Sequence, residues 1–163
     1  VDLPGHGRSA GERVTPHLLG QLLNELERDL GHVHTAIGHS FGGAAIGAAI
    51  RYGFHPSRLV IVSSPTCVSR IPYIYAKMMG LPERAMAHFG PIAELDLIAT
   101  GPGCGIPALL VHDRDDAVIP YSEAEALVAA WPELKVMTTA GLGHRDILAN
   151  GEVIRAISEF VTA

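Results

Sequence analysis

Apolar positions in this chain of 163 residues change between helical and strand-like spacing. Leucines recur at helical spacing between residues 18 and 30, which places them along one side of a helix. Thr15 and Pro16 precede them as a typical helix start, and Gly31 follows them as a typical helix end. Short apolar runs without this spacing predict four buried strands, at residues 33–37, 58–63, 107–112 and 134–139.

Three further segments have helical character. Residues 41–50 are rich in small side chains, residues 121–131 begin with Ser122 and Glu125 at the spacing of a capping box, and residues 152–161 come last. Strands separated by helices imply right-handed crossovers and a parallel sheet. Continuous apolar strands are typical of a sheet covered on both faces. We therefore predict an α/β fold, a doubly wound parallel sheet with helices on both faces, in one domain over residues 1–163.

Residues 65–100 interrupt the alternation of strands and helices. The stretch is rich in methionine, aromatic and aliphatic residues, and several prolines and glycines divide it. It is too long for a plain loop, so we interpret it as an inserted, mostly helical cap. Its apolar side chains either pack on one another or form a pocket for an apolar acyl group, and the sequence leaves both interpretations open.

Composition and charge argue against some classes of binding partner. The chain has 12 basic and 17 acidic residues and a net charge of −5, without the concentrated positive face that nucleic-acid binding needs. No apolar run approaches the ~20 residues of a membrane-spanning helix. Cys67 and Cys104 lack the spacing of metal ligands. We expect two free thiols, a cytoplasmic location, and neither a metal nor another cofactor.

The first candidate catalytic motif is the sequence GHSFGG at residues 38–43, between a predicted strand and a predicted helix. A sharp strand-to-helix turn would expose the Ser40 hydroxyl, with Gly38 and Gly42 leaving room around it. The N-terminus of the following helix favours negative charge, so the Phe41 N–H is a candidate oxyanion-hole donor. The motif predicts Ser40 as a nucleophile; the alternative is a glycine-rich turn with an unreactive serine.

A serine hydroxyl needs a neighbouring base. In a parallel sheet the candidates lie beyond the carboxyl ends of the strands. The predicted strand at 107–112 is followed by Asp113, Asp115 and Asp116, and the strand at 134–139 is followed by His144. His144 can accept the serine proton while an aspartate orients the imidazole. Taken singly, His144 could be a solvated loop residue and each aspartate a turn former.

Four motifs together resemble those of the α/β-hydrolase fold family. They are LPGHGRS at 3–9, GHSFGG at 38–43, HDRDDAVIP at 112–120 and GLGH at 141–144, and the resemblance covers the whole chain. It implies a serine hydrolase that cleaves an ester or related acyl bond, with a small apolar substrate. It also implies Ser40, Asp116 and His144 as catalytic residues, since the family's acid stands four positions before a proline. Asp113 occupies a place where relatives often have glycine.

The resemblance also implies parts that this chain lacks. The family has further strands before the first motif, and a His-Gly motif there supplies a second oxyanion-hole donor. We therefore expect the chain to be incomplete at its N-terminus and to have an exposed sheet edge. An upstream segment, or a second copy in a homo-oligomer, would cover that edge. A different class of protein, a non-catalytic binding module or an inactive fragment, stays open as the alternative.

Overall fold

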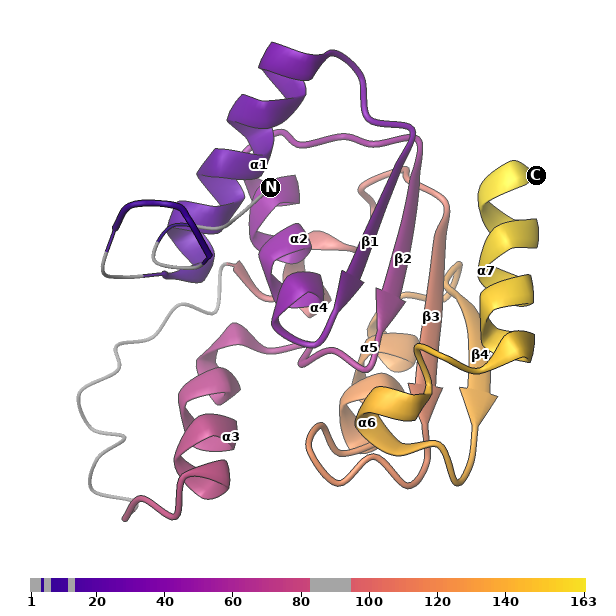
Figure 1. Ribbon diagram of the computed structural model, residues 1–163. Coiled ribbons are helices and arrows are strands. Elements are labelled where there is room, and N and C mark those ends of the chain that lie inside the picture. Colours follow the sequence, from indigo (N-terminus) through magenta and orange to yellow (C-terminus); the bar gives the residue numbers. More distant parts are fainter. Residues whose placement is uncertain (1–3, 5–6, 12–13, 83–94) are drawn as a thin grey trace.

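Four parallel strands form one sheet in the computed structural model, which describes residues 4, 7–11, 14–82 and 95–163 (Figure 1). The strands lie in the order β1-β2-β3-β4, and each pairs in parallel with the next. They are β1 (Thr35–His39), β2 (Arg58–Val62), β3 (Ala108–Asp113) and β4 (Lys135–Thr139). The predicted α/β fold with a parallel sheet is confirmed, and the sequential order places β1 and β4 at opposite edges.

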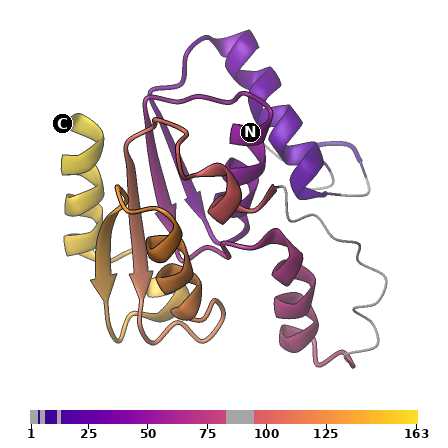
Figure 2. The ribbon, with the colours of Figure 1, turned by 180° about the vertical axis from the view of Figure 1, so that it is seen from behind.

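Helices cover both faces of this sheet (Figures 1 and 2). One face packs on α2 (Phe41–Arg51), α4 (Leu97–Thr100) and α5 (Ser122–Ala130) through a core that contains Ile61 and Leu110. The other face packs on α7 (Gly151–Thr162) through a core that contains Val62 and Val111. Neighbouring residues of β2 and β3 thus point to opposite cores, which is why these two strands have continuous apolar sequences.

The two edge strands differ from the prediction of strands buried on both sides. In β1 the side chain of Ile37 is 57% exposed, and in β4 that of Val136 is 43% exposed. Beside β1 an apolar groove of about 360 Å³ runs between the strand and the preceding helix, α1 (Pro16–Leu30), and Leu23 and Leu26 are among its lining residues. The expectation of cover on both faces therefore holds for β2 and β3 and is wrong for the edges.

Local sequence signals explain the start and end of α1 and the packing of α2. The Thr15 hydroxyl accepts a hydrogen bond from the Leu18 N–H at 3.1 Å, and Gly31 ends the helix with a φ of 86°. A Cβ atom on Gly47 would lie 3.2 Å from the Leu97 Cα. The small residues of α2 therefore allow it to pack closely against neighbouring elements, and this fixes the direction of its N-terminus at the site.

The predicted capping box of α5 is wrong. The carbonyls of Pro120 and Tyr121 already accept hydrogen bonds from the N–H groups of Glu123 and Glu125. The helical turn thus begins before Ser122, and no side chain caps the helix. An N-cap residue needs extended backbone, and Tyr121 instead has a φ of −57° and a ψ of −22°.

The segment predicted as a cap includes two described helical pieces before α4. They are the single turn η1 (Val68–Arg70) and α3 (Ile71–Met78), and residues 83–94 lie outside the described residues. In Figure 1, α3 lies beyond the carboxyl ends of β1 and β2. Within the described ranges, no helix is both long enough and apolar enough to span a bilayer.

Candidate active site

Ser40 lies in a strained turn between β1 and α2. Its backbone has a φ of 54° and a ψ of −124°, a conformation that costs a non-glycine residue about 1–3 kcal/mol. The Ser40 N–H donates to the Val62 carbonyl at 3.0 Å, which ties the turn to β2. A Cβ on Gly38 would lie 2.6 Å from the Gly43 nitrogen, so glycine is required there. The same reason does not apply to Gly42, because no described atom lies within 4 Å of its Cβ position.

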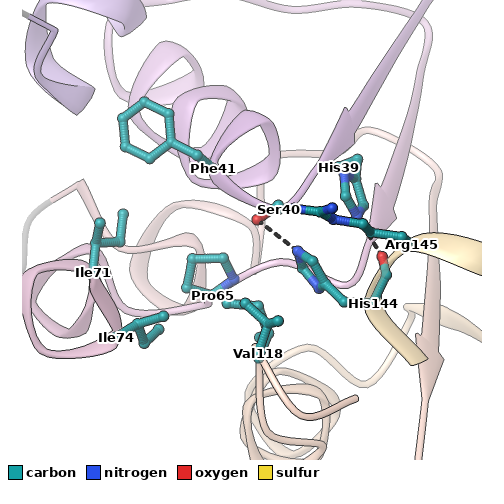
Figure 3. Close-up of a pocket in the computed structure, with 10 residues that line it drawn as sticks. His39, Ser40, Phe41, Pro65, Ile71, Ile74, Val118, His144 and Arg145 are labelled. Carbon is teal, nitrogen blue, oxygen red and sulfur yellow. Dashed lines mark hydrogen bonds between the residues drawn. The ribbon is translucent and has the colours of Figure 1, made fainter. Parts of the chain in front are cut away.

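The structure brings the three predicted site residues together from segments that follow three different strands. Ser40 lies in the turn after β1, Asp116 in the loop after β3, and His144 in α6 (Gly143–Asp146), the short helix after β4. The His144 Nε2 lies 3.1 Å from the Ser40 Oγ (Figure 3). The His144 Nδ1 lies 2.8 Å from the Asp116 Oδ2. An ionised carboxylate can only accept, so the imidazole proton is on Nδ1 and points to Asp116. In the neutral ring, Nε2 is then free to accept the Ser40 hydroxyl proton.

Asp116 is fixed by its own loop. Its side chain is fully buried, and its Oδ1 accepts hydrogen bonds from the N–H groups of Val118 and Ile119, both at 2.8 Å. The other oxygen, Oδ2, is the one that faces His144. The two carboxylate oxygens therefore have separate partners, one in the backbone and one in the imidazole.

Asp113, the last residue of β3, and Asp115, in the loop that follows, hold the segment just before α6, the helix that carries His144. Asp113 is buried, and its Oδ2 accepts from the Thr139 hydroxyl at 2.6 Å and from the Leu142 N–H at 3.1 Å. The Asp115 Oδ2 accepts from the Gly141 N–H at 2.8 Å. Burial alone would raise the pKa of Asp113, but the hydrogen bonds that Asp113 accepts from the Thr139 hydroxyl and from backbone N–H groups, that of Leu142 among them, outweigh it and hold the pKa below its usual value. The sequence marked Asp113 as unusual without indicating this role.

Replacing Asp113 by asparagine should lower stability in a pH-dependent way. A carboxylate whose pKa is depressed by folding stabilises the protein above its unfolded pKa of about 4, and this contribution is lost as the pH falls through the lower folded value. We expect Asp113→Asn to reduce the free energy of unfolding by about 1–3 kcal/mol at pH 7. The difference from wild type should shrink in urea unfolding below about pH 4.

The matched control is Asp146→Asn, since Asp146 is an exposed aspartate at the end of α6. It should leave the unfolding free energy near the wild-type value at both pH values. A deficit in Asp113→Asn that stays constant from neutral to acid pH would contradict an ionised role for this carboxylate.

His39 is a further histidine at the site, and it lines the same pocket as Ser40 and His144. Its Nε2 lies 2.9 Å from the His144 carbonyl oxygen and donates to it, because a carbonyl only accepts. The two imidazole rings have centroids 4.7 Å apart. Burial lowers the pKa of His39, against the opposing effect of the hydrogen bond to His144. His39 therefore fixes the backbone of His144 as a neutral donor.

A pocket of about 240 Å³ opens beside Ser40 and His144. Its apolar lining comes from the turn after Ser40, from the start of the segment at 65–100 and from the loop after β3 (Figure 3). These lining residues are Phe41, Pro65, Ile71, Ile74, Val118 and Ile119. The Phe41 N–H begins α2 and has no acceptor inside that helix. It is thus available at the positive end of the helix dipole. In the described part of the chain, no group of three or more acidic, histidine or cysteine side chains could hold a metal ion.

Solved structures of other proteins share this fold. The monoacylglycerol lipase of Paleococcus ferrophilus is 17% identical with a TM-score of 0.72, over 98% of this chain and 80% of that one. A thermophilic esterase is 21% identical with a TM-score of 0.71, over 99% and 79%. Est1E of Butyrivibrio proteoclasticus, solved with ferulic acid, is 21% identical with a TM-score of 0.67, over 99% and 76%. The fold is that of the α/β hydrolases.

The amino-acid sequence gives the same assignment independently. Residues 1–98 match the sequence family described as the alpha/beta hydrolase family. The chain therefore belongs to the alpha/beta hydrolase family, which confirms the resemblance seen in its motifs and supports a hydrolytic function. No curated protein matches the chain.

Proposed function

We propose that this protein hydrolyses an ester or related acyl bond through an acyl-enzyme on Ser40. One observation carries the proposal: an unbroken line of hydrogen bonds joins the Ser40 hydroxyl, the His144 imidazole and the buried Asp116 carboxylate. Ser40 and His144 also line a pocket that has an apolar wall. A nucleophile, a base and a group that orients the base are the set that activates a serine.

In the first half of the reaction, the Ser40 Oγ attacks the carbonyl carbon of the substrate, and its proton moves to the His144 Nε2. The carbonyl oxygen becomes an oxyanion and accepts the Phe41 N–H, a contact that strengthens as charge develops. Asp116 stabilises the imidazolium without taking its proton. When the bond to the leaving oxygen breaks, His144 gives that proton to the departing alcohol, and the acyl group stays on Ser40.

In the second half, a water molecule replaces the alcohol. His144 takes a proton from the water as its oxygen attacks the acyl carbon. The bond to the Ser40 Oγ then breaks, and the proton returns from His144 to that oxygen. The products are a carboxylic acid and the original enzyme, so each side chain ends in its starting state.

The pocket supports a small apolar acyl group. Its volume of about 240 Å³ lies below the ~300–1,000 Å³ typical of sites for drug-sized ligands. Ser40 and His144 are placed where the reaction would occur, His39 and Arg145 also line the pocket, and apolar side chains such as Ile74 and Val118 form the rest of its wall. Two of the solved structures that share the fold are named as a lipase and an esterase, which agrees with this substrate class.

Labelling with a fluorophosphonate tests the proposal, since such probes react with activated serines. The protein should gain one covalent adduct, and mass spectrometry of its peptides should locate the adduct on Ser40. Complete absence of labelling would overturn the proposed function. Binding of esters without turnover or labelling would point instead to a non-catalytic binding module.

We also infer that another polypeptide segment covers the groove beside β1. A strand edge with unpaired backbone groups next to apolar side chains invites pairing. In β1 this edge carries the exposed Ile37, and the adjoining groove is lined by Leu26, Val33 and Phe54. The covering segment comes either from the same protein upstream or from a second copy of the chain.

Sedimentation of the 163-residue chain tests this inference. Without another segment, the chain should self-associate through β1, and Ile37→Lys should raise the dissociation constant more than about tenfold, or 1.4 kcal/mol. Val136→Lys is the matched control, because Val136 is also an exposed apolar residue on an edge strand. A wild-type chain that stays monomeric, or equal effects of the two variants, would contradict pairing through β1.

A further inference from the structure

A buried carboxylate that the proposed mechanism does not use joins α5 to the start of the inserted segment. The Glu123 side chain is 4% exposed. Its Oε2 accepts two hydrogen bonds from Thr66, at 2.9 Å from the backbone N–H and at 2.7 Å from the hydroxyl. Its Oε1 accepts from the Arg70 guanidinium at 2.6 Å. One side chain of α5 therefore fixes two residues of the segment, four positions apart.

The far end of the segment returns to the same place. The Asp96 Oδ1 accepts from the Val68 N–H at 2.6 Å, and the Thr66 carbonyl accepts from the Ile98 N–H at 3.5 Å. Thr66 and Val68 thus contact residues about thirty positions further along the chain. The base of the inserted segment is held both to itself and to α5, and Glu123 is the contact that reaches α5.

The residues that Glu123 holds are next to pocket residues in sequence. Pro65 immediately precedes Thr66, and Ile71, the first residue of α3, immediately follows Arg70. Pro65, Ile71 and Ile74 all line the pocket that contains Ser40 (Figure 3). Any movement of the turn from Thr66 to Arg70 would therefore shift the apolar wall of the pocket.

The charge of Glu123 is maintained in the folded protein. Burial by itself would raise the pKa of Glu123, but the hydrogen bonds from Thr66 and the ion pair with Arg70 outweigh this and leave the pKa below its usual value. A buried carboxylate is costly unless its partners are well placed, and removing one partner is more damaging than never having the pair. The contact thus demands a defined position for Arg70.

We propose that Glu123 is a positioning residue that determines acyl-chain selectivity at the Ser40 site, by holding the turn from Thr66 to Arg70 and, through it, the wall formed by Ile71 and Ile74. The inference rests on the proposed hydrolase function and adds a specificity role to it. Glu123 touches neither the substrate nor the reacting atoms. Its influence is expected on the apolar side of the pocket, where the length of the acyl chain is recognised.

Glu123→Gln breaks the contact with little change in shape. The amide oxygen can still accept from Thr66, but the amide nitrogen then meets the Arg70 guanidinium, and both groups are donors. The wall loses its fixed position, so contacts to a longer acyl chain weaken more than contacts to an acetyl group. We expect the ratio of kcat/KM for p-nitrophenyl hexanoate over p-nitrophenyl acetate to fall about tenfold, the size of effect that one methylene has in an apolar pocket.

The experiment compares wild type, Glu123→Gln and Glu125→Gln on both esters. Glu125 is exposed on the same helix, and its replacement should leave the ratio unchanged. Arg70→Met removes the same ion pair from the other side and should shift the ratio in the same direction. This second variant serves if Glu123→Gln fails to fold, because the Arg70 side chain is 57% exposed.

The outcomes separate this inference from the proposed function. Wild-type labelling on Ser40 together with an unchanged ester ratio in both Glu123→Gln and Arg70→Met would overturn the role of Glu123 alone. An equal loss on both esters with a lower melting temperature would also overturn it, because that pattern reflects stability without selectivity. Failure of wild type to be labelled would instead remove the proposed function.

Discussion

Replacing Ser40 by alanine is expected to reduce kcat/KM for ester hydrolysis by about 10⁴–10⁶, and to abolish fluorophosphonate labelling. In the described part of the chain, Ser40 supplies the only hydroxyl that hydrogen-bonds to His144. No other side chain there can therefore take over the attack. The change removes one oxygen atom and leaves Cβ in place, so the strained backbone and the surrounding packing should persist. Initial-rate measurements on p-nitrophenyl acetate provide the test.

Ser122→Ala is the matched control for this prediction. Ser122 is an exposed serine at the start of α5, and its replacement should leave both the rate and the labelling at wild-type levels. Thermal denaturation should give similar midpoints for the two variants, which separates chemistry from folding. A Ser40→Ala protein that folds and still hydrolyses esters at the wild-type rate would contradict the assignment of the nucleophile.

Replacing Asp116 by asparagine is expected to lower kcat by about 10⁴ with little change in fold. The loss of kcat follows from the contacts of the two carboxylate oxygens of Asp116. The N–H groups of Val118 and Ile119 require an acceptor at Oδ1, so the asparagine oxygen should occupy that position. The amide nitrogen then faces the His144 Nδ1 and donates to it. The imidazole proton moves to Nε2, and His144 can no longer accept the serine proton.

Comparison with Asp115→Asn isolates this effect, because Asp115 lies in the same loop and contacts Gly141 instead of His144. An asparagine there keeps an oxygen that can accept the Gly141 N–H, so kcat should change little. Activity lost equally in both variants would indicate general damage to the loop. A normal kcat in Asp116→Asn would show that another group orients His144.

The sequence predicted the central strands well because they are buried on both sides. The runs at 58–63 and 107–112 correspond to β2 and β3 within one residue at each end. At the edge, the run at 33–37 predicted a strand that begins and ends two residues too early, since β1 is Thr35–His39. The other edge strand, β4 (Lys135–Thr139), agrees with the run at 134–139 within one residue, so the offset is confined to β1.

The contacts that complete the site were less predictable, because they depend on which loops meet. The sequence placed Ser40, Asp116 and His144 at the ends of strands, and their hydrogen bonds agree with that hypothesis. It gave no signal that Glu123 would reach Thr66, whose position is 57 residues away. Its local spacing even suggested a capping box that the structure does not contain. Where a side chain has several possible partners nearby in sequence, its actual hydrogen-bond partner can be assigned only once its neighbours in the folded structure are known.

The sequential order of the strands has a consequence for how the chain reaches its native state. Ser40 follows one edge strand and His144 follows the other, and 104 positions separate them. Their contact therefore needs all three crossovers of the sheet in place. Pairings between residues this far apart in sequence form slowly in comparison with helices. During refolding, the reactivity of Ser40 toward a fluorophosphonate should thus return after the helical signal. The return of this reactivity reports the moment at which the topology is complete.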